Sequence, residues 1–519
     1  MLKQTLVLSI ILMATQLTAQ KTVTKLPGEM WWGGHIARAA EMPFEKGYKA
    51  DLDEDYNGQV QTLLLSNKGR YIYSETPFSF SVEDYDIILA GDDGYVIGTS
   101  GKTLASAYAY AATNFMVFSN QKLDNSVTLP QYNLAVQLGD NPSQSSILSF
   151  ANQIIADSLP AGILLFSSDW QESQGSFSFD LKNFPDPEKM LTQLDELGFK
   201  VVLEVSAFIS PDSKTFRKLV SRDYAFLADA LNPEEVKIVK WKNGYSAVLD
   251  LTNPSSKVWL EKRLKDLQKK GIAGFSFAGG SMEEYQDVIS EGGTDPYELS
   301  EAYSSIGLKS KMSFYGPGYK MGGYPLVRKL PTQDLTWFNL NKVLSSVTLQ
   351  GLMGYPYGQL DLVSDKEELG ESQQELIVRA AQLQAFMPSM SALNIPISSL
   401  RGKYLDAYNE TLRVRENISP TLKKLISKAG RSGTPVIQSM EFAFPDKGYV
   451  DIKDQFMIGD EYLVAPILEE GQKKRTVTFP EGVWLSPDGR GYGGPMTQEF
   501  KVSLDRPLYF QSVTIDTKS

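Results

Sequence analysis

The chain has 519 residues, of which 42% are hydrophobic and 11% aromatic, and its formal net charge is −11 at pH 7. That length is enough for two to four domains with sizeable cores. The negative charge argues against nucleic acid and anionic membrane surfaces as partners, because both are bound through basic patches. There is no cysteine and only one histidine, His35. Disulfides and thiolate metal sites are therefore excluded, a single histidine makes a serine–histidine triad implausible, and acid–base chemistry would fall to carboxylates.

The chain carries no spacing typical of a zinc site and no phosphate-binding glycine loop. The pair Gly279-Gly280 follows an apolar run and is interpreted as a tight turn after a strand. We therefore expect neither a metal nor a cofactor.

The first 19 residues have the features of a secretory signal peptide. Lys3 supplies a positive start, Leu6–Met13 is apolar, and small residues precede a cleavage point after Ala19. The apolar run is too short to cross a bilayer, so we expect no membrane insertion. The sequence predicts export to a bacterial periplasm or to the medium.

Residues 20–143 are predicted to form a β-sandwich. Short strands, separated by turn residues, are expected at Gln59–Ser66, Tyr71–Ser74, Ser79–Val82 and Asp86–Leu89.

Residues 144–432 show apolar strands alternating with amphipathic helices, the pattern of parallel β/α units. Over this length a (β/α)8 barrel is the economical arrangement. The expected strands are Ile163–Phe166, Lys200–Val205, Ala247–Asp250 and Ile272–Ala278, and the expected helices are Pro187–Leu197 and Ser255–Lys270.

Residues 433–519 return to β-structure, with one or two small domains expected. The predicted strands are Val436–Gln438, Tyr462–Pro466, Lys474–Phe479 and Arg506–Phe510.

This three-part order resembles glycoside hydrolase family 31, which includes α-glucosidases and α-xylosidases. The motifs that carry the resemblance are Ser66–Ser74 with Pro77-Phe78, Phe184–Pro187 with Met190, Val248–Pro254 with Trp259, Gln455–Asp460, Leu463–Pro466 and Phe479–Trp484. Within the family, the motifs around Trp241-Asn243-Gly244, Gly354–Pro356 and Ala385–Pro388 look most similar to the myogenesis-regulating glycosidase branch and its bacterial α-galactosidase-like members.

The resemblance implies a retaining reaction between two carboxylates about 5–5.5 Å apart. The nucleophile of such enzymes ends the fourth barrel strand, and that position is Ala278 here. A methyl group can neither attack a sugar nor stabilise a cation. The polar family residues near it correspond to Ser276 and Ser281. These replacements remove charge from the pocket.

The family's acid/base position corresponds to Asp334, although this residue could instead cap a helix over Phe338–Leu344. The resemblance implies that the sugar also meets side chains from several other segments. These substrate-binding candidates are Ser168, Asp169, Trp170, Asp250, Trp337 and Asp361.

Two interpretations stay open at this point. The protein has either lost retaining hydrolysis and binds a glycan, or it hydrolyses α-glycosides with a substitute carboxylate and Asp334 as acid/base. The candidates for that substitute are Glu283, Glu284 and Asp287, just beyond the strand end. A solvated acidic loop is the plainer interpretation of the three. Whether the chain is an enzyme is therefore open; a carbohydrate is the expected partner, and self-association is undecided.

Overall fold

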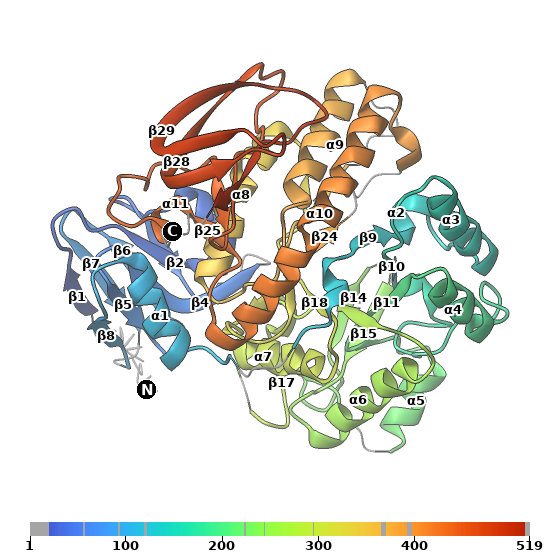
Figure 1. Ribbon diagram of the computed structural model, residues 1–519. Coiled ribbons are helices and arrows are strands. Elements are labelled where there is room, and N and C mark those ends of the chain that lie inside the picture. Colours follow the sequence, from blue (N-terminus) through green and yellow to red (C-terminus); the bar gives the residue numbers. More distant parts are fainter. Residues whose placement is uncertain are drawn as a thin grey trace, which may run out of the picture.

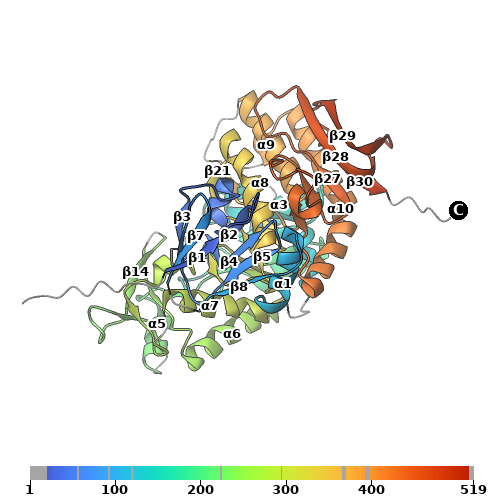
Figure 2. The ribbon, with the colours of Figure 1, turned by 90° about the vertical axis from the view of Figure 1, so that its left-hand side faces the viewer.

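The computed structural model divides the chain into three parts, an N-terminal pair of β-sheets, a central barrel and a C-terminal β-sheet (Figures 1 and 2). It describes residues 20–54, 58–91, 94–118, 122–222, 225–242, 244–293, 295–364, 370–391 and 397–513. The predicted signal peptide and Asn243 lie outside these residues. In the described part of the chain, no helix combines the length and the apolar character needed to cross a bilayer.

The N-terminal part contains two antiparallel sheets. One has the order β1 (Gln20–Thr24), β7 (Asp86–Ala90), β6 (Ser79–Val82), β3 (Lys49–Asp51). The other has the order β19 (Gly318–Tyr319), β4 (Gln59–Ser66), β5 (Arg70–Tyr73), β8 (Val96–Thr99), and β2 (Trp31–His35) pairs with β4. Strand β19 comes from a loop of the barrel and runs parallel to β4. The predicted strands are thus present, and α1 (Leu104–Asn114) follows them.

The central part is a parallel barrel of eight strands, as the sequence predicts. The order in the sheet is β22 (Gly358–Gln359), β20 (Val327–Lys329), β18 (Ser313–Tyr315), β16 (Gly274–Phe277), β11 (Lys200–Val205), β10 (Ile163–Phe166), β9 (Pro130–Asn133), β24 (Met390–Ser391). At the seam between the two ends of this sheet, the main-chain N–H of Ser389 donates to the carbonyl of Gly358 at 3.2 Å. Strand β9 is already part of the barrel sheet, so the barrel starts earlier than residue 144.

One predicted barrel strand lies elsewhere. The segment Ala247–Asp250 overlaps β15 (Gly244–Val248), which pairs antiparallel with β12 (Phe208–Ile209) and β14 (Ile238–Trp241). The expectation of a parallel strand was wrong because the apolar residues of β15 are buried in a separate small core with Phe208 and Tyr285. This three-stranded sheet is an insertion beside the barrel.

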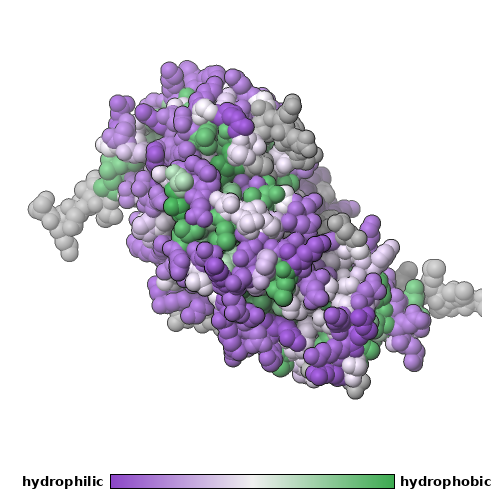
Figure 3. Space-filling view, turned by 90° about the vertical axis from the view of Figure 1, so that its right-hand side faces the viewer, coloured by the Kyte–Doolittle hydropathy of each residue, from purple (hydrophilic) through white to green (hydrophobic). Residues whose placement is uncertain are grey.

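Helices cover the outside of the barrel (Figure 1). They include α3 (Gln144–Ala156), α4 (Pro187–Glu196), α5 (Lys214–Val220), α6 (Pro254–Gln268), α7 (Pro296–Ile306), α8 (Trp337–Leu352), α9 (Glu371–Gln384) and α10 (Lys403–Ser432). In α4 the Asp186 side chain caps the first turn by accepting from the Lys189 N–H, and the apolar face buries Met190 and Leu194. The face seen in Figure 3 is mostly hydrophilic, with hydrophobic residues in separate patches.

The C-terminal part is a single sheet in the described residues, where one or two domains were expected. Its strand order is β25 (Ile437–Ser439), β26 (Phe456–Ile458), β27 (Tyr462–Val464), β30 (Tyr509–Val513), β28 (Lys474–Leu485), β29 (Gly491–Lys501).

A buried arginine ties the barrel seam together. Arg415, on α10, is 1% exposed, and its guanidinium donates to main-chain carbonyls of Thr128, Ala385, Met387 and Pro388. Burial lowers its pKa to about 9. Thr128 precedes the first barrel strand, and residues 385–388 precede the last one. The Arg415 side chain therefore binds the segments that lead into both strands at the seam.

The only histidine gives the fold a measurable pH dependence. His35 is 1% exposed, its Nε2 lies 2.8 Å from the carbonyl oxygen of Asp51, and burial lowers its pKa from 6.5 to about 4. Because the unfolded chain takes up this proton more readily, the free energy of unfolding should fall by about 3 kcal/mol as the pH drops from 6.5 to 4.

Urea unfolding at several pH values would measure this effect against His35→Gln, which cannot titrate. Carboxylates also titrate in this range, so the difference between the two proteins isolates the histidine. Identical pH slopes for both proteins would contradict the assignment.

Candidate active site at the barrel mouth

Ala278 lies at the carboxyl end of the fourth barrel strand, β16. Its N–H donates to the Val205 carbonyl at 2.9 Å, which continues the pairing of β16 with β11. Its own carbonyl accepts from the Tyr303 hydroxyl at 2.7 Å. Both main-chain groups of Ala278 are therefore fixed, and the alanine methyl stands at the place where barrel enzymes carry catalytic groups.

A lysine from the sixth strand reaches toward this position. Lys329 ends β20, and its Nζ lies 3.1 Å from Oγ of Ser276, with which it shares a hydrogen bond. Ser276 is buried in β16, two residues before Ala278. An ammonium group therefore lies close to the end of the fourth strand.

An ion pair lies at the ends of the second and third strands. Glu204 in β11 accepts a hydrogen bond from Nζ of Lys242, and the same ammonium donates to Oγ of Ser168 at 2.8 Å. Glu204 is aligned with Ser276 in the neighbouring strand. Lys242 comes from the turn of the inserted hairpin between β14 and β15, so the insertion brings a charge to the mouth of the barrel.

The same insertion packs against the turn after Ala278. The rings of Phe208 and Trp241 are stacked with centroids 4.0 Å apart, and a Cβ placed on Gly279 would lie 2.5 Å from the Phe208 ring. Gly279 has φ +80°, so both its conformation and this contact require glycine. The aromatic stack thus forms a wall at this side of the mouth.

The three substitute carboxylates are held differently. Glu284 accepts from the N–H groups of Gly280 and Ser281 at 2.5 and 3.2 Å, and so caps the short helix at Met282–Tyr285. Glu283 and Asp287 are exposed. Of the three, only Glu284 is turned back toward the strand end, where its carboxylate binds main-chain N–H groups.

Asp334 is exposed and lies in β21 (Gln333–Asp334), which pairs with β23 (Leu362–Val363) beyond the ends of the sixth and seventh strands. The alternative role as a helix cap is wrong, because Thr336 accepts from the Asn339 N–H and caps α8. The carboxylate of Asp334 is therefore not used by the helix.

Trp337 and Asp361 belong to the same pair of loops. Trp337 is half-buried at the first turn of α8. Asp361 accepts from the hydroxyl of Thr332 at 2.5 Å, and its carbonyl accepts from the Gln333 N–H. The structure thus brings Asp334, Trp337 and Asp361 to one side of the mouth.

The candidates after the second strand differ in exposure. Ser168 contacts Lys242, as described above. Asp169 is exposed, and Trp170 is 1% exposed, with its indole N–H donating to the Glu204 carbonyl at 2.8 Å. Trp170 therefore supports the wall of the mouth from within and presents no open stacking face.

Asp250 has a structural environment. It is 1% exposed, and one oxygen accepts from the N–H and hydroxyl of Thr252 while the other accepts from the N–H of Glu291. The two bonds from Thr252 lie within the loop after β15, and the bond from Glu291 joins this loop to the loop before α7.

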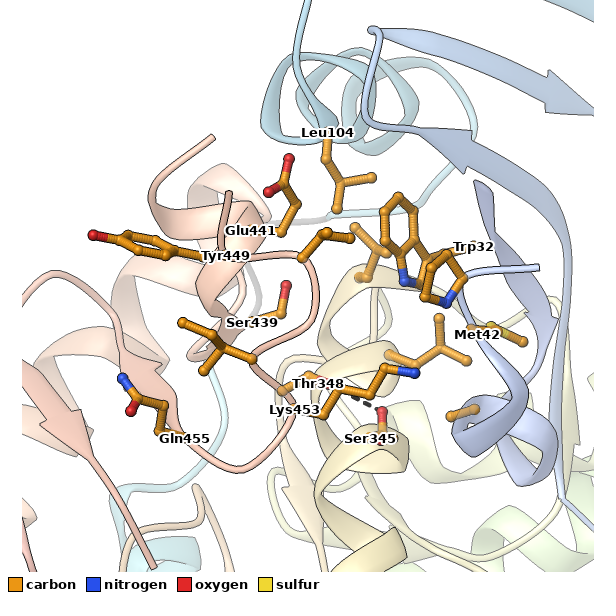
Figure 4. A pocket seen from close by; sticks show the side chains of 16 residues that line it. Trp32, Met42, Leu104, Ser345, Thr348, Ser439, Glu441, Tyr449, Lys453 and Gln455 are labelled. Carbon is orange, nitrogen blue, oxygen red and sulfur yellow. Dashed lines mark hydrogen bonds between the residues drawn. The ribbon is translucent and has the colours of Figure 1, made fainter. Parts of the chain in front are cut away.

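A cavity elsewhere lies between the three parts of the molecule. Its volume is about 50 Å³, and its lining includes Trp32 from β2, Thr348 from α8, and Glu441 and Lys453 from the C-terminal part (Figure 4). Sugar-sized ligands need several hundred Å³. The cavity is therefore too small for a glycan.

No group of three or more His, Asp or Glu side chains in the described residues is placed to hold a metal ion. The charged residues that sequence reasoning missed are Glu204, Lys242 and Lys329. Glu204 had a signal in the sequence, since it is the one charge inside the otherwise apolar run Val201–Val205.

Family models and known proteins agree on the class of the protein. Residues 126–322 match the model of the glycosyl hydrolases family 31 TIM-barrel domain, and residues 433–515 match that of the family 31 C-terminal domain. The chain belongs to glycoside hydrolase family 31.

Individual relatives are distant in sequence. The chain is 26% identical over 387 residues to the mouse myogenesis-regulating glycosidase, covering 71% of this chain and 54% of that protein. It is 22% identical over 489 residues to the α-xylosidase XylQ of Lactiplantibacillus pentosus, covering 86% of this chain and 63% of the relative. The chain thus spans between half and two thirds of the length of these two curated relatives.

Solved structures share the fold more completely. A family 31 α-xylosidase from a soil metagenome, complexed with xylose, superposes with a TM-score of 0.83 at 18% identity, covering 96% of this chain and 79% of that one. A family 31 sulfoquinovosidase from E. rectale gives 0.79 at 16% identity, covering 96% and 83%.

The contacts of Asp250 predict a role in stability. Asp250→Ala should lower the free energy of unfolding by about 1–3 kcal/mol, because it removes a buried carboxylate that accepts three part-buried hydrogen bonds. Urea unfolding measures this change.

Asp169→Ala, which removes an exposed aspartate after the second strand, is the matched control and should change stability by less than about 0.5 kcal/mol. Equal stability of the Asp250→Ala protein and the wild type would contradict the structural role.

Proposed function

We propose that the protein binds α-glycosides at the barrel mouth and does not hydrolyse them by the retaining route of its family. The proposal rests on Ala278 at the carboxyl end of β16. Its N–H donates to the Val205 carbonyl, and its carbonyl accepts from the Tyr303 hydroxyl. A retaining reaction needs a carboxylate that attacks the anomeric carbon and forms a covalent intermediate. Alanine has no atom that can do so.

The surrounding carboxylates support this proposal. Glu284 is engaged by the two N–H groups that it caps, and Glu204 is engaged by Lys242. Glu283 and Asp287 point to solvent-exposed surface of the loop. An attack by any of them would require breaking existing contacts or moving the loop.

Known proteins supply the ligand class. The solved structures with this fold include an α-xylosidase with xylose and an aspartate-to-alanine mutant of a Flavobacterium johnsoniae dextranase complexed with isomaltotriose. Replacement of an aspartate by alanine is therefore compatible with a bound α-glucan oligosaccharide in that enzyme. We extend this to the present chain, in which the exposed Asp334 and the half-buried Trp337 and Asp361 lie at one side of the mouth.

We expect no turnover of aryl α-glucosides, α-galactosides, α-xylosides or α-sulfoquinovosides by the purified protein. Loss of a nucleophile typically costs on the order of 10⁴-fold or more in rate. Ala278→Asp should restore measurable hydrolysis, with Ala278→Asn as an isosteric control without a nucleophile. Adding Asp334→Asn to Ala278→Asp should abolish this hydrolysis again, because the acid/base is removed.

Clear turnover by the unmodified protein would overturn the proposal and make Glu283, Glu284 and Asp287 the targets for substitution. The proposal also predicts that calorimetry detects binding of the same glycosides. A well-folded protein that binds none of them would also overturn the proposal.

We further propose that the protein is exported, with the first 19 residues removed. The positive start, apolar run and small residues before Gln20 support this proposal. Mass spectrometry of the protein recovered from a bacterial periplasm or medium should give a chain beginning at Gln20. Recovery of the uncleaved chain from the cytoplasm alone would contradict it.

A further inference from the structure

The ammonium of Lys329 has a different environment from that of Lys242. Lys242 is neutralised by Glu204 and also donates to Ser168. Lys329 has the neutral hydroxyl of Ser276 as its hydrogen-bond partner, and no carboxylate among the described residues pairs with it. A half-buried ammonium without an anionic partner is unfavourable, because part of its hydration is lost without compensation.

The neighbouring strand end indicates where the missing anion would belong. Ser276 and Ala278 are two residues apart in an extended segment, so their side chains lie on one face about 6.6 Å apart. The Ser276 hydroxyl is already 3.1 Å from Nζ of Lys329. The alanine at 278 therefore leaves room for a small group close to the ammonium, where a longer acidic side chain would otherwise stand.

The described carboxylates around the mouth are poorly placed to take this role. Glu284 is held by main-chain N–H groups, and Asp361 accepts from the hydroxyl of Thr332. Glu204 is aligned with Ser276 but binds Lys242. Asp334 is exposed in β21, and among the described residues it forms no ion pair with Lys329, whose hydrogen-bond partner is Ser276. We therefore look to the ligand for the anion that pairs with Lys329.

We propose that the glycan bound at the barrel mouth carries an oxyanion, such as the carboxylate of a hexuronic acid, and that this group binds Nζ of Lys329 beside Ala278. The inference rests on the proposed function, since it names the ligand class of the same site. A charge-assisted hydrogen bond to an oxyanion is about twice as strong as one between neutral groups. A sulfate ester on the sugar offers the same chemistry and is distinguished below.

Calorimetry with methyl α-glucuronide, methyl α-glucoside and a 6-sulfated methyl α-glucoside tests the proposal on the mature protein. The glucuronide should bind at least about ten-fold more tightly than the glucoside. Lys329→Gln should weaken glucuronide binding by about 10- to 100-fold and change glucoside binding by less than about two-fold. Lys265→Gln, which removes an exposed lysine on the outer helix α6, controls for the change in net charge.

Ala278→Asp, combined with Asp334→Asn so that the glycosides are not hydrolysed during the measurement, provides a second test that keeps Lys329 in place. The new carboxylate should compete for the ammonium and remove the preference for the acidic sugar. If circular dichroism shows that Lys329→Gln does not fold, this variant is used as the test instead. Tighter binding of the sulfated sugar than of the glucuronide would identify the oxyanion as a sulfate ester.

Equal affinities for neutral and acidic glycosides would overturn the inference and leave the proposed function intact. An acidic preference that survives both Lys329→Gln and Ala278→Asp would also overturn it, because the anion would then bind elsewhere. Failure to bind any glycoside would overturn the inference together with the proposed function.

Discussion

The barrel depends on the buried guanidinium of Arg415. A parallel barrel must join its first and last strands, which are far apart in the chain, and here those strands are only two to four residues long at the seam. Arg415 offers donors in a fixed plane to carbonyls from both approaches, and burial strengthens those bonds. Closing the seam fixes the positions of the strand ends at the mouth relative to one another.

The charges at the mouth come from several different elements of the fold. The fourth strand has Ser276 and Ala278, whereas the third and sixth strands supply Glu204 and Lys329, and the inserted hairpin supplies Lys242. The uncharged end of the fourth strand thus lies among charged side chains from other strands and from the hairpin. A site that had simply decayed would have no reason to hold an ion pair and a second ammonium at this place.

Sequence reasoning predicts the architecture well because apolar periodicity and turn residues are local signals. The strand Lys200–Val205 and the helix starting at Pro187 are present with nearly the predicted bounds. Sequence reasoning fails where residues distant in the chain determine how a strand pairs. An example is β15, which is buried against Phe208 in a separate sheet. The contact between Lys329 and Ser276 joins positions 53 residues apart, and no local pattern encodes it.

Strand β19 shows how the N-terminal sheets and the barrel are combined. Gly318–Tyr319 leaves the barrel after its fifth strand and pairs with β4, and the nearby Lys320 binds Glu75 on the N-terminal side. The barrel thus contributes a short strand to its neighbour's sheet. A fragment containing only the N-terminal part would leave the main chain of Gln59 and Val60 without this pairing, and unpaired strand groups recruit other chains. Cutting the chain at this junction is therefore expected to destabilise both parts.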